Sequence, residues 1–118
     1  MKLFKKEEGF TLVELMVVVL IIGILVAIAI PVFNAARARA EERTCFANQR
    51  TVEGAVQQYL ADDAGNVIGD LATAADLVPD FLAQEPLCPT TDASYSIGAD
   101  GLVDGTPGTN GCDTHGHY

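Results

Sequence analysis

The side chains that could do chemistry in this sequence are acids, cysteines and two histidines. His115 and His117 lie close to Cys112 and Asp113, and imidazole, thiolate and carboxylate groups are usual zinc ligands. Histidines among turn residues, however, are more often exposed and without a metal ion. A second group could offer oxygens to Ca²⁺, namely Asp100, Asp104, Asn110 and Asp113. It lacks the Asp-x-Asp-x-Asp-Gly spacing of a calcium loop, so we expect no metal ion and no cofactor.

No arrangement typical of an active site occurs in the sequence. There is no Ser-His-Asp grouping, no glycine-rich phosphate loop and no His-Glu-x-x-His motif. We therefore expect that the chain is not an enzyme.

The charge is strongly asymmetric along the chain. Seven basic and sixteen acidic residues give a net charge of −9, and no Lys or Arg follows Arg50, whereas eleven acidic residues do. A surface of this charge repels phosphate backbones and stays soluble. We expect no direct nucleic-acid binding by this acidic part.

One apolar segment must position any functional group near the N-terminus. No charged residue occurs from Leu15 to Phe33, and as a helix these nineteen residues rise about 28 Å. That length matches the hydrocarbon core of a bilayer. Because three lysines lie in the first six positions, the N-terminus is expected to stay in the cytoplasm. The segment therefore predicts a transmembrane helix with the rest of the chain outside.

Good helix formers continue beyond the apolar segment. Apolar residues recur there with a period near 3.5, at Cys45, Val52, Val56 and Tyr59, with Ala55 and Leu60 alongside. The pattern predicts a single helix from Phe10 to about Ala61, with one stripe available for packing. Gly23 and Pro31 are the expected points of bending or local melting.

The remaining sequence predicts a small head. A short helix is indicated within residues 70–82, with Thr73 as N-cap and Asp76 as the acid of a capping box. Residues 94–97 and 102–103 flank a glycine-containing turn and predict a hairpin. The expected fold class is α+β, a long N-terminal helix and a small C-terminal head containing a short antiparallel sheet.

Three cysteines, Cys45, Cys88 and Cys112, have no Cys-x-x-Cys spacing. A small domain outside the cytoplasm is usually constrained by disulfides. A Cys88–Cys112 bridge would close a loop in the head, worth about 3 kcal/mol by chain entropy, and would leave Cys45 as the odd thiol. A Cys45–Cys88 bridge that ties the head to the helix is the alternative.

The run Lys5-Lys6-Glu7-Glu8-Gly9-Phe10-Thr11-Leu12-Val13-Glu14-Leu15 is the most specific signal in the sequence. It is a short basic leader that ends in Gly, followed by Phe and by Thr-Leu-Val-Glu-Leu at the start of an apolar helix. This run resembles the class III signal of type IV prepilins, and the match extends to about Phe33 and includes Pro31. The resemblance implies a type IV pilin or pseudopilin, a structural subunit of a pilus or related filament assembled by helix packing.

The resemblance also implies roles for individual residues. A prepilin peptidase would cut between Gly9 and Phe10 and methylate the new Phe10 amine. Glu14 would pair with that amine on a neighbouring copy, while Pro31 would belong to the assembly helix. The chain would lie in the inner membrane as a precursor and then in an extracytoplasmic filament, at the cell surface or in the periplasm. Its partners would be further copies of itself and the assembly machinery of a pilus or a type II secretion system.

The domain organisation follows from these elements: leader 1–9, transmembrane and filament-core helix 10–33, amphipathic helix 34–63, and acidic head 64–118. Three alternatives stay open. Glu14, a costly carboxylate beside hydrocarbon, could instead reach the lipid headgroups. Ala27-Ile28-Ala29 could be the cleavage site of an ordinary secretory signal. The whole chain could be a monomeric, single-pass membrane-anchored ectodomain that binds a metal or a protein partner.

Overall fold

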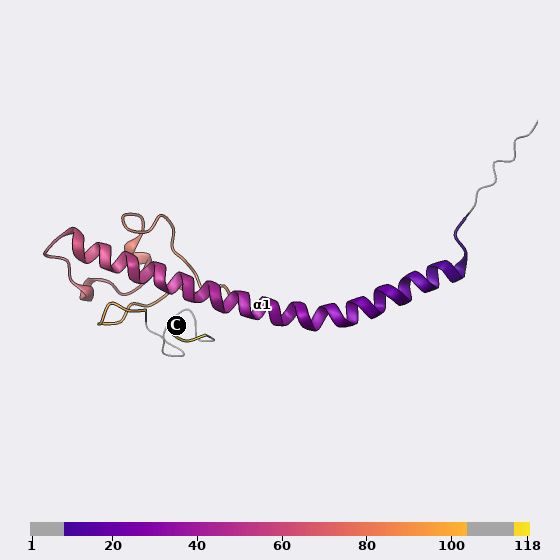
Figure 1. Ribbon diagram of the computed structural model, residues 1–118. Coiled ribbons are helices and arrows are strands. Elements are labelled where there is room, and N and C mark those ends of the chain that lie inside the picture. Colours follow the sequence, from indigo (N-terminus) through magenta and orange to yellow (C-terminus); the bar gives the residue numbers. More distant parts are fainter. Residues whose placement is uncertain (1–8, 104–114) are drawn as a thin grey trace, which may run out of the picture. The chain divides into compact units, whose positions relative to one another are not determined.

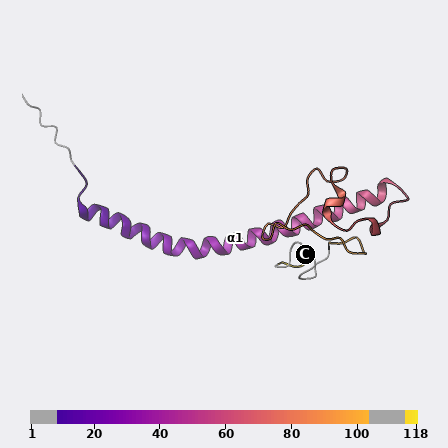
Figure 2. The same cartoon turned by 180° about the vertical axis from the view of Figure 1, so that it is seen from behind.

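A computed structural model describes residues 9–103 and 115–118. One long helix, α1 (Leu12–Asp62), is followed by two short 3₁₀ helices, η1 (Ile68–Asp70) and η2 (Ala74–Leu77), which lie in connecting segments (Figures 1 and 2). The predicted single helix is therefore confirmed, and its ends fall within two residues of the expected ones. The chain divides after Arg37 into two compact units, which are described separately.

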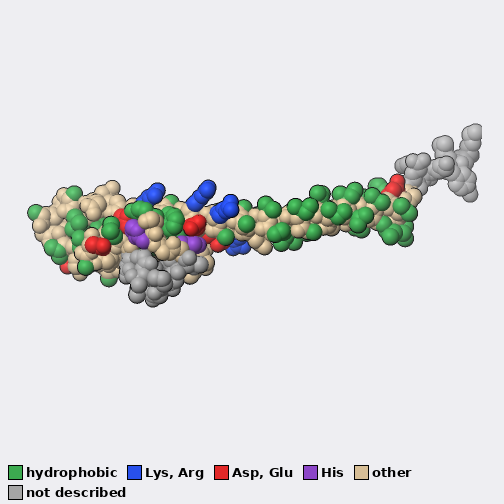
Figure 3. All heavy atoms as spheres, turned by 60° about the horizontal axis from the view of Figure 1, so that its bottom comes forward, with side chains coloured by type: hydrophobic (Ala, Val, Ile, Leu, Met, Phe, Trp, Pro, Cys, Tyr) green, Lys and Arg blue, Asp and Glu red, His purple; other side chains and the backbone are tan. Residues whose placement is uncertain are grey.

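In the N-terminal unit the large apolar side chains of α1 are all exposed. Their exposed fractions run from 45% at Val26 to 73% at Leu12, and Figure 3 shows hydrophobic side chains all along these turns. The most apolar 18-residue window of α1 has a mean hydropathy of 3.2, and none of it is buried. The helix is thus long and apolar enough to cross a bilayer, as the sequence predicts.

The C-terminal unit contains the only buried core within the described residues. The later turns of α1 contribute Cys45, Val52, Ala55 and Val56 to it, while Tyr59 and Leu60 pack against it. This is the stripe predicted from the apolar period, and it is confirmed. Because these positions recur every three or four residues, they lie on one face of the helix.

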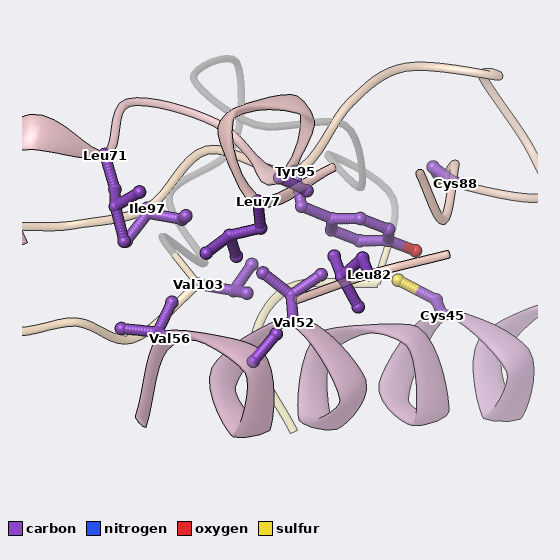
Figure 4. Close-up of a cluster of buried hydrophobic side chains, with 12 residues drawn as sticks. Cys45, Val52, Val56, Leu71, Leu77, Leu82, Cys88, Tyr95, Ile97 and Val103 are labelled. Atoms are coloured by element: carbon purple, nitrogen blue, oxygen red, sulfur yellow. The ribbon is translucent and has the colours of Figure 1, made fainter. Parts of the chain in front are cut away.

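The other side of this core comes from segments that contain little regular structure. They contribute Leu71, Ala74, Leu77, Leu82, Cys88, Tyr95, Ile97 and Val103, and Figure 4 shows these side chains gathered over α1. Tyr95 is the largest fully buried side chain. A small head with one aromatic residue at its centre has little apolar surface to bury, so every contact with α1 matters for its stability.

The short helix predicted within residues 70–82 corresponds to η2, whereas η1 ends at Asp70 and was not predicted. Asp76 Oδ2 accepts hydrogen bonds from the backbone N–H groups of Thr73 and Ala72, both at 2.8 Å. Thr73 is the N-cap of η2, and the predicted capping box is present. These bonds lower the pKa of Asp76 below its ordinary value of 3.8.

The predicted antiparallel sheet is wrong for the part of the chain that the structure describes. That part contains no strand, but only three isolated antiparallel bridges, Thr73–Ser96, Leu87–Ser94 and Ile97–Val103. Ser94, Ser96 and Ile97 each pair with a residue of a different segment, so no pairing extends into a ladder. The turn of the predicted hairpin does form, since Gly98 N–H donates to Leu102 O at 2.8 Å.

Candidate assembly site and head contacts

The predicted processing site lies immediately before α1. Gly9 and Phe10 are outside the helix and exposed, and the Phe10 side chain is 87% exposed. The bond between them is therefore in exposed, non-helical chain, as a protease requires of its substrate. The leader residues 1–8 lie outside the described residues.

Thr11 and Glu14 together cap the start of α1. Glu14 Oε2 accepts hydrogen bonds from the backbone N–H of Thr11 at 2.7 Å and from its hydroxyl at 3.0 Å. In return, the backbone N–H of Glu14 donates to Thr11 Oγ1 at 3.2 Å. This is a capping box, in which two otherwise unpaired N–H groups are satisfied reciprocally.

The cap was missed by the sequence analysis, although its signal is present. Thr-x-x-Glu before an apolar run is the capping-box spacing, and Thr11-Leu12-Val13-Glu14 has it. The cap also leaves capacity for a second contact. An ionised carboxylate can accept about four hydrogen bonds on its two oxygens, and both Thr11 donors use Oε2. Glu14 can therefore cap its own helix and still accept a bond from another group.

Pro31 lies inside α1, which is assigned as helix without interruption through both Gly23 and Pro31. Local melting, one of the two predicted outcomes, is therefore absent at these positions. Proline lacks the N–H that would bond the carbonyl one turn earlier. The apolar half of the helix consequently carries one broken backbone hydrogen bond without losing its helical assignment.

The cysteines differ from the predicted pairing. Cys45 is disulfide-bonded, whereas Cys88 carries a thiol, and both are fully buried. Neither the Cys88–Cys112 bridge nor the alternative Cys45–Cys88 bridge agrees with this assignment, and Cys112 lies outside the described residues. The prediction was based on the entropy of loop closure, and this quantity does not determine which sulfur atoms lie close together in the fold.

A second site, absent from the sequence analysis, lies where residues 116–118 meet α1. Gln49 Nε2 donates to Gly116 O at 2.6 Å, and Gln49 Oε1 accepts from Tyr118 N–H at 3.2 Å. Glu53 accepts from His117 Nε2 at 2.7 Å and from the Tyr118 hydroxyl. The Arg50 guanidinium lies 4.6 Å from the centre of the Tyr118 ring. The six residues that make these contacts are called the 116–118 clamp below: Gln49, Arg50, Glu53, Gly116, His117 and Tyr118.

The contacts within the clamp shift the pKa values of Glu53 and Tyr118. Burial raises the pKa of Glu53, but the hydrogen bonds from Tyr118, His117 and the Val103 N–H outweigh it, so that this pKa lies below 4.5. The pKa of Tyr118 is raised above 10, chiefly by its hydrogen bond to Glu53. The clamp therefore favours a charged Glu53 beside a neutral Tyr118. The signal that was overlooked is the spacing of Gln49 and Glu53, which continue the buried Cys45 face at intervals of four.

The structure thus combines one exposed apolar helix of membrane length, capped at its start by a carboxylate, with a small head carried by the later turns of the same helix. A family described as the prokaryotic N-terminal methylation motif matches residues 4–30. This range includes the Gly9–Phe10 junction, the Thr11–Glu14 cap and most of the apolar run.

Curated relatives match about half of the chain. A "Fimbrial protein EcpC" of Eikenella corrodens is 45% identical over 56 residues, 48% of this chain and 37% of that protein. A "Type IV major pilin protein PilA" of Myxococcus xanthus is 41% identical, over 54% of this chain and 31% of that protein. A "Type II secretion system core protein G" of Vibrio cholerae is 34% identical, over 54% of this chain and 44% of that protein.

The chain thus spans less than half the length of each of these relatives, and no solved structure matches it significantly. With the methylation motif, these matches show that about half of the chain is similar to fimbrial proteins, a type IV pilin and a type II secretion core protein. The resemblance given by the leader is confirmed.

Proposed function

We propose that this chain is a structural subunit of a type IV pilus or a related secretion filament, assembled by packing of α1 against α1 of other copies. The observation that carries the proposal is the exposed apolar surface from Leu12 to Phe33. Such a surface is stable only in lipid or against other apolar helices. Both environments occur in turn for a subunit that leaves a membrane to enter a filament.

Before assembly, the subunit spans the inner membrane with its head on the extracytoplasmic side. A prepilin peptidase cuts between Gly9 and Phe10 and methylates the new amine, and the pilus or secretion machinery then extracts the subunit. Cutting removes the three lysines of the leader, each of which costs several kcal/mol to draw into hydrocarbon. Cleavage therefore makes extraction possible on energetic grounds.

In the filament, Glu14 accepts an ionic hydrogen bond from the Phe10 amine of a neighbouring copy. An unpaired carboxylate among apolar side chains is strongly unfavourable, and a charge-assisted hydrogen bond offsets much of that cost. Apolar hollows on the helix surface support close helix contact. One is lined by Val13, Leu20, Gly23 and Ala27, among others, and a second adjoins Glu14.

The proposal has a direct chemical test. Mass spectrometry of the protein isolated from its host should show a chain that begins at methylated Phe10 and is recovered in filaments. A chain that begins at Met1 or Ile30 and stays monomeric would instead support the anchored or the secreted alternative.

The pairing role of Glu14 is tested by comparison with its own capping partner. Glu14→Ala removes both the cap and the intersubunit bond, whereas Thr11→Ala removes the cap and retains the carboxylate. We expect Glu14→Ala to insert into the membrane normally and to form no filaments that electron microscopy can detect. Thr11→Ala should lose about 1 kcal/mol at the helix start and still assemble. Equal loss of filaments in both variants would show that Glu14 acts only as a cap.

A further inference from the structure

Two arginines of α1 lack a partner of opposite charge among the described residues. Arg39 and Arg43 are exposed and lie about one helical turn apart on the same side of α1. Neither forms an ion pair with another described residue, and Figure 3 shows basic side chains that project from the molecular surface. We propose that in the filament these two arginines bind the C-terminal end of α1 of a second copy, at Asp62 and Asp63. This contact rests on the proposed function and specifies how two copies recognise each other.

The arginine pair and the acidic end of α1 are both unfavourable in a single chain. Like charges four positions apart on a helix repel each other, as Arg39 and Arg43 do. Asp62 ends α1, and the last turn of this helix contains no basic residue. Negative side chains destabilise this end of a helix, because its unpaired carbonyl groups already carry partial negative charge. A contact that brings the arginines of one copy to the acids of another offsets both costs.

The acidic end of α1 is accessible to such a partner. Asp62 and Asp63 are both exposed. Asp63 Oδ1 accepts a hydrogen bond from the Gly65 N–H at 2.8 Å, which leaves the second oxygen of this carboxylate to accept another. Guanidinium groups bind carboxylates through two parallel hydrogen bonds. The end of α1 therefore has the chemistry that exposed arginines recognise.

Basic side chains are scarce in the chain that would enter a filament. Without residues 1–9, which contain three lysines and two glutamates, the chain keeps four basic and fourteen acidic residues. Copies of this charge repel one another, so oppositely charged groups are needed where they touch. Arg50 lies over the Tyr118 ring, and Arg37 already interacts within its own chain. Arg39 and Arg43 are the basic side chains that remain for a contact between copies.

The contact fixes the offset between two copies along the filament. All copies leave the membrane in the same orientation, so their helices are parallel. Asp62 is nineteen positions after Arg43, which corresponds to about 28 Å of helix. Pairing of the Phe10 amine with Glu14 spans four positions, or about 6 Å. The two contacts therefore involve different neighbouring copies, as a helical assembly with several contacts per subunit allows.

Anionic lipid headgroups are the other partner that exposed arginines beside an apolar helix attract. Lipid would neutralise Arg39 and Arg43 before assembly, but it would leave the acids at the end of α1 without a cation. A second copy neutralises both groups at once. The charges of the chain therefore favour a second copy as the partner.

The test exchanges charges across the contact in the full chain, expressed in its host. Arg43→Glu should lower the yield of sheared filaments at least about tenfold, because it places acids of two copies together. Asp62→Arg should lower the yield by a similar factor, because it places bases together. The double variant Arg43→Glu/Asp62→Arg restores opposite charges, so its yield should return to within about threefold of that of the original chain.

Glu42→Arg/Arg43→Glu is the matched control. It has the same composition and net charge as the rescued variant, but it moves the positive charge about 100° round the helix and leaves Asp62 unchanged. Its yield should stay as low as that of Arg43→Glu. Circular dichroism and mass spectrometry should show that every variant folds and begins at Phe10. Asp62→Arg is expected to fold, since it adds a basic residue to the last turn of α1.

Three results would overturn the contact. A yield of Arg43→Glu equal to that of the original chain would show that the arginine is not used. A loss that Asp62→Arg fails to restore would point to lipid headgroups instead and would leave the proposed function intact. Absence of filaments from the original chain itself would contradict the contact and the proposed function together.

Discussion

Replacing Glu53 by Gln tests whether the 116–118 clamp stabilises the head. Glu53 is 8% exposed and accepts three hydrogen bonds, from Val103 N–H at 3.1 Å, from His117 Nε2 at 2.7 Å and from the Tyr118 hydroxyl. Glutamine keeps the shape of the side chain but has a single acceptor oxygen and no charge. The variant therefore changes hydrogen bonding and charge without opening a cavity.

The expected cost follows from these contacts. A hydrogen bond to a charged group contributes about 1.5–3 kcal/mol when it is intact. His117 has a side chain that is 30% exposed, so solvent screens its contact with Glu53 and the lower part of that range applies. Because glutamine can retain one of the three bonds, we expect the free energy of unfolding to fall by about 1.5–3 kcal/mol.

The assay is urea unfolding of the full chain in detergent, followed by the near-ultraviolet circular dichroism of the tyrosines. For a small head, a slope of about 1 kcal/mol/M converts the expected cost into a midpoint lower by about 1.5–3 M. Glu42→Gln is the matched control. Glu42 is an exposed glutamate of the same helix, and its replacement should change stability by less than about 0.5 kcal/mol.

A double-mutant cycle with Tyr118→Phe isolates the bond between Glu53 and Tyr118. Tyr118→Phe removes only the hydroxyl, so a direct bond predicts that the effects of the two changes are not additive. Strict additivity of the two changes would refute the reasoning, as would an equal loss of stability in Glu42→Gln.

The pH dependence of the same comparison has a defined sign. The pKa of Glu53 is below 4.5 in the folded chain, so its stabilisation is present above pH 4.5 and is lost as the pH falls through the lowered pKa. The pKa of Tyr118 is above 10, so its contribution is present below pH 10 and is lost as the pH rises further. The stability difference between the original chain and Glu53→Gln should shrink in acid. A difference that grows below pH 4.5 would contradict the assignment.

Two further changes test the core and the cap of η2 by the same unfolding assay. Leu77→Ala should cost about 2–5 kcal/mol, because Leu77 is 1% exposed in the core and its loss leaves a cavity; a cost below about 1 kcal/mol would mean that the core is loosely packed. Asp76→Asn should cost about 0.5–2 kcal/mol, since Asp76 Oδ2 accepts N–H bonds from Ala72 and Thr73. An Asp76→Asn variant as stable as the original chain would show that these bonds add nothing beyond what asparagine supplies.

The helix, with its exposed apolar first half and its core-facing stripe, could be predicted from the sequence because these features depend on local periodicity. An uncharged run from Leu15 to Phe33 and a 3.5-residue stripe from Cys45 onward specify α1 without reference to distant residues. The capping boxes at Glu14 and Asp76 have fixed local spacings too. The box at Asp76 was predicted, and the box at Glu14 could have been, because Thr11-Leu12-Val13-Glu14 has the capping-box spacing.

The arrangement of the head could not be predicted in the same way, because it depends on contacts between distant segments. Glu53 receives bonds from residues 50 and 64–65 positions away in the sequence, and nothing local indicates them. The predicted hairpin forms its turn and the single Ile97–Val103 bridge but does not extend into a sheet, for a related reason. Ser96 pairs with Thr73 rather than with the neighbouring arm, so the local alternation of residues 94–97 indicated extended chain but not its partner.

The cap on α1 bears on how one carboxylate can serve in both environments of the proposed life cycle. In lipid, Glu14 has no neighbouring copy to bind, and an unsatisfied carboxylate there would oppose insertion. Two Thr11 donors within 3.0 Å and the positive end of the helix dipole reduce that cost before any partner is present. Because Thr11 uses Oε2 alone, an incoming amine can bind without first breaking the cap. Assembly then adds a bond to Glu14 rather than exchanging one, and this favours the filament over the membrane-inserted monomer.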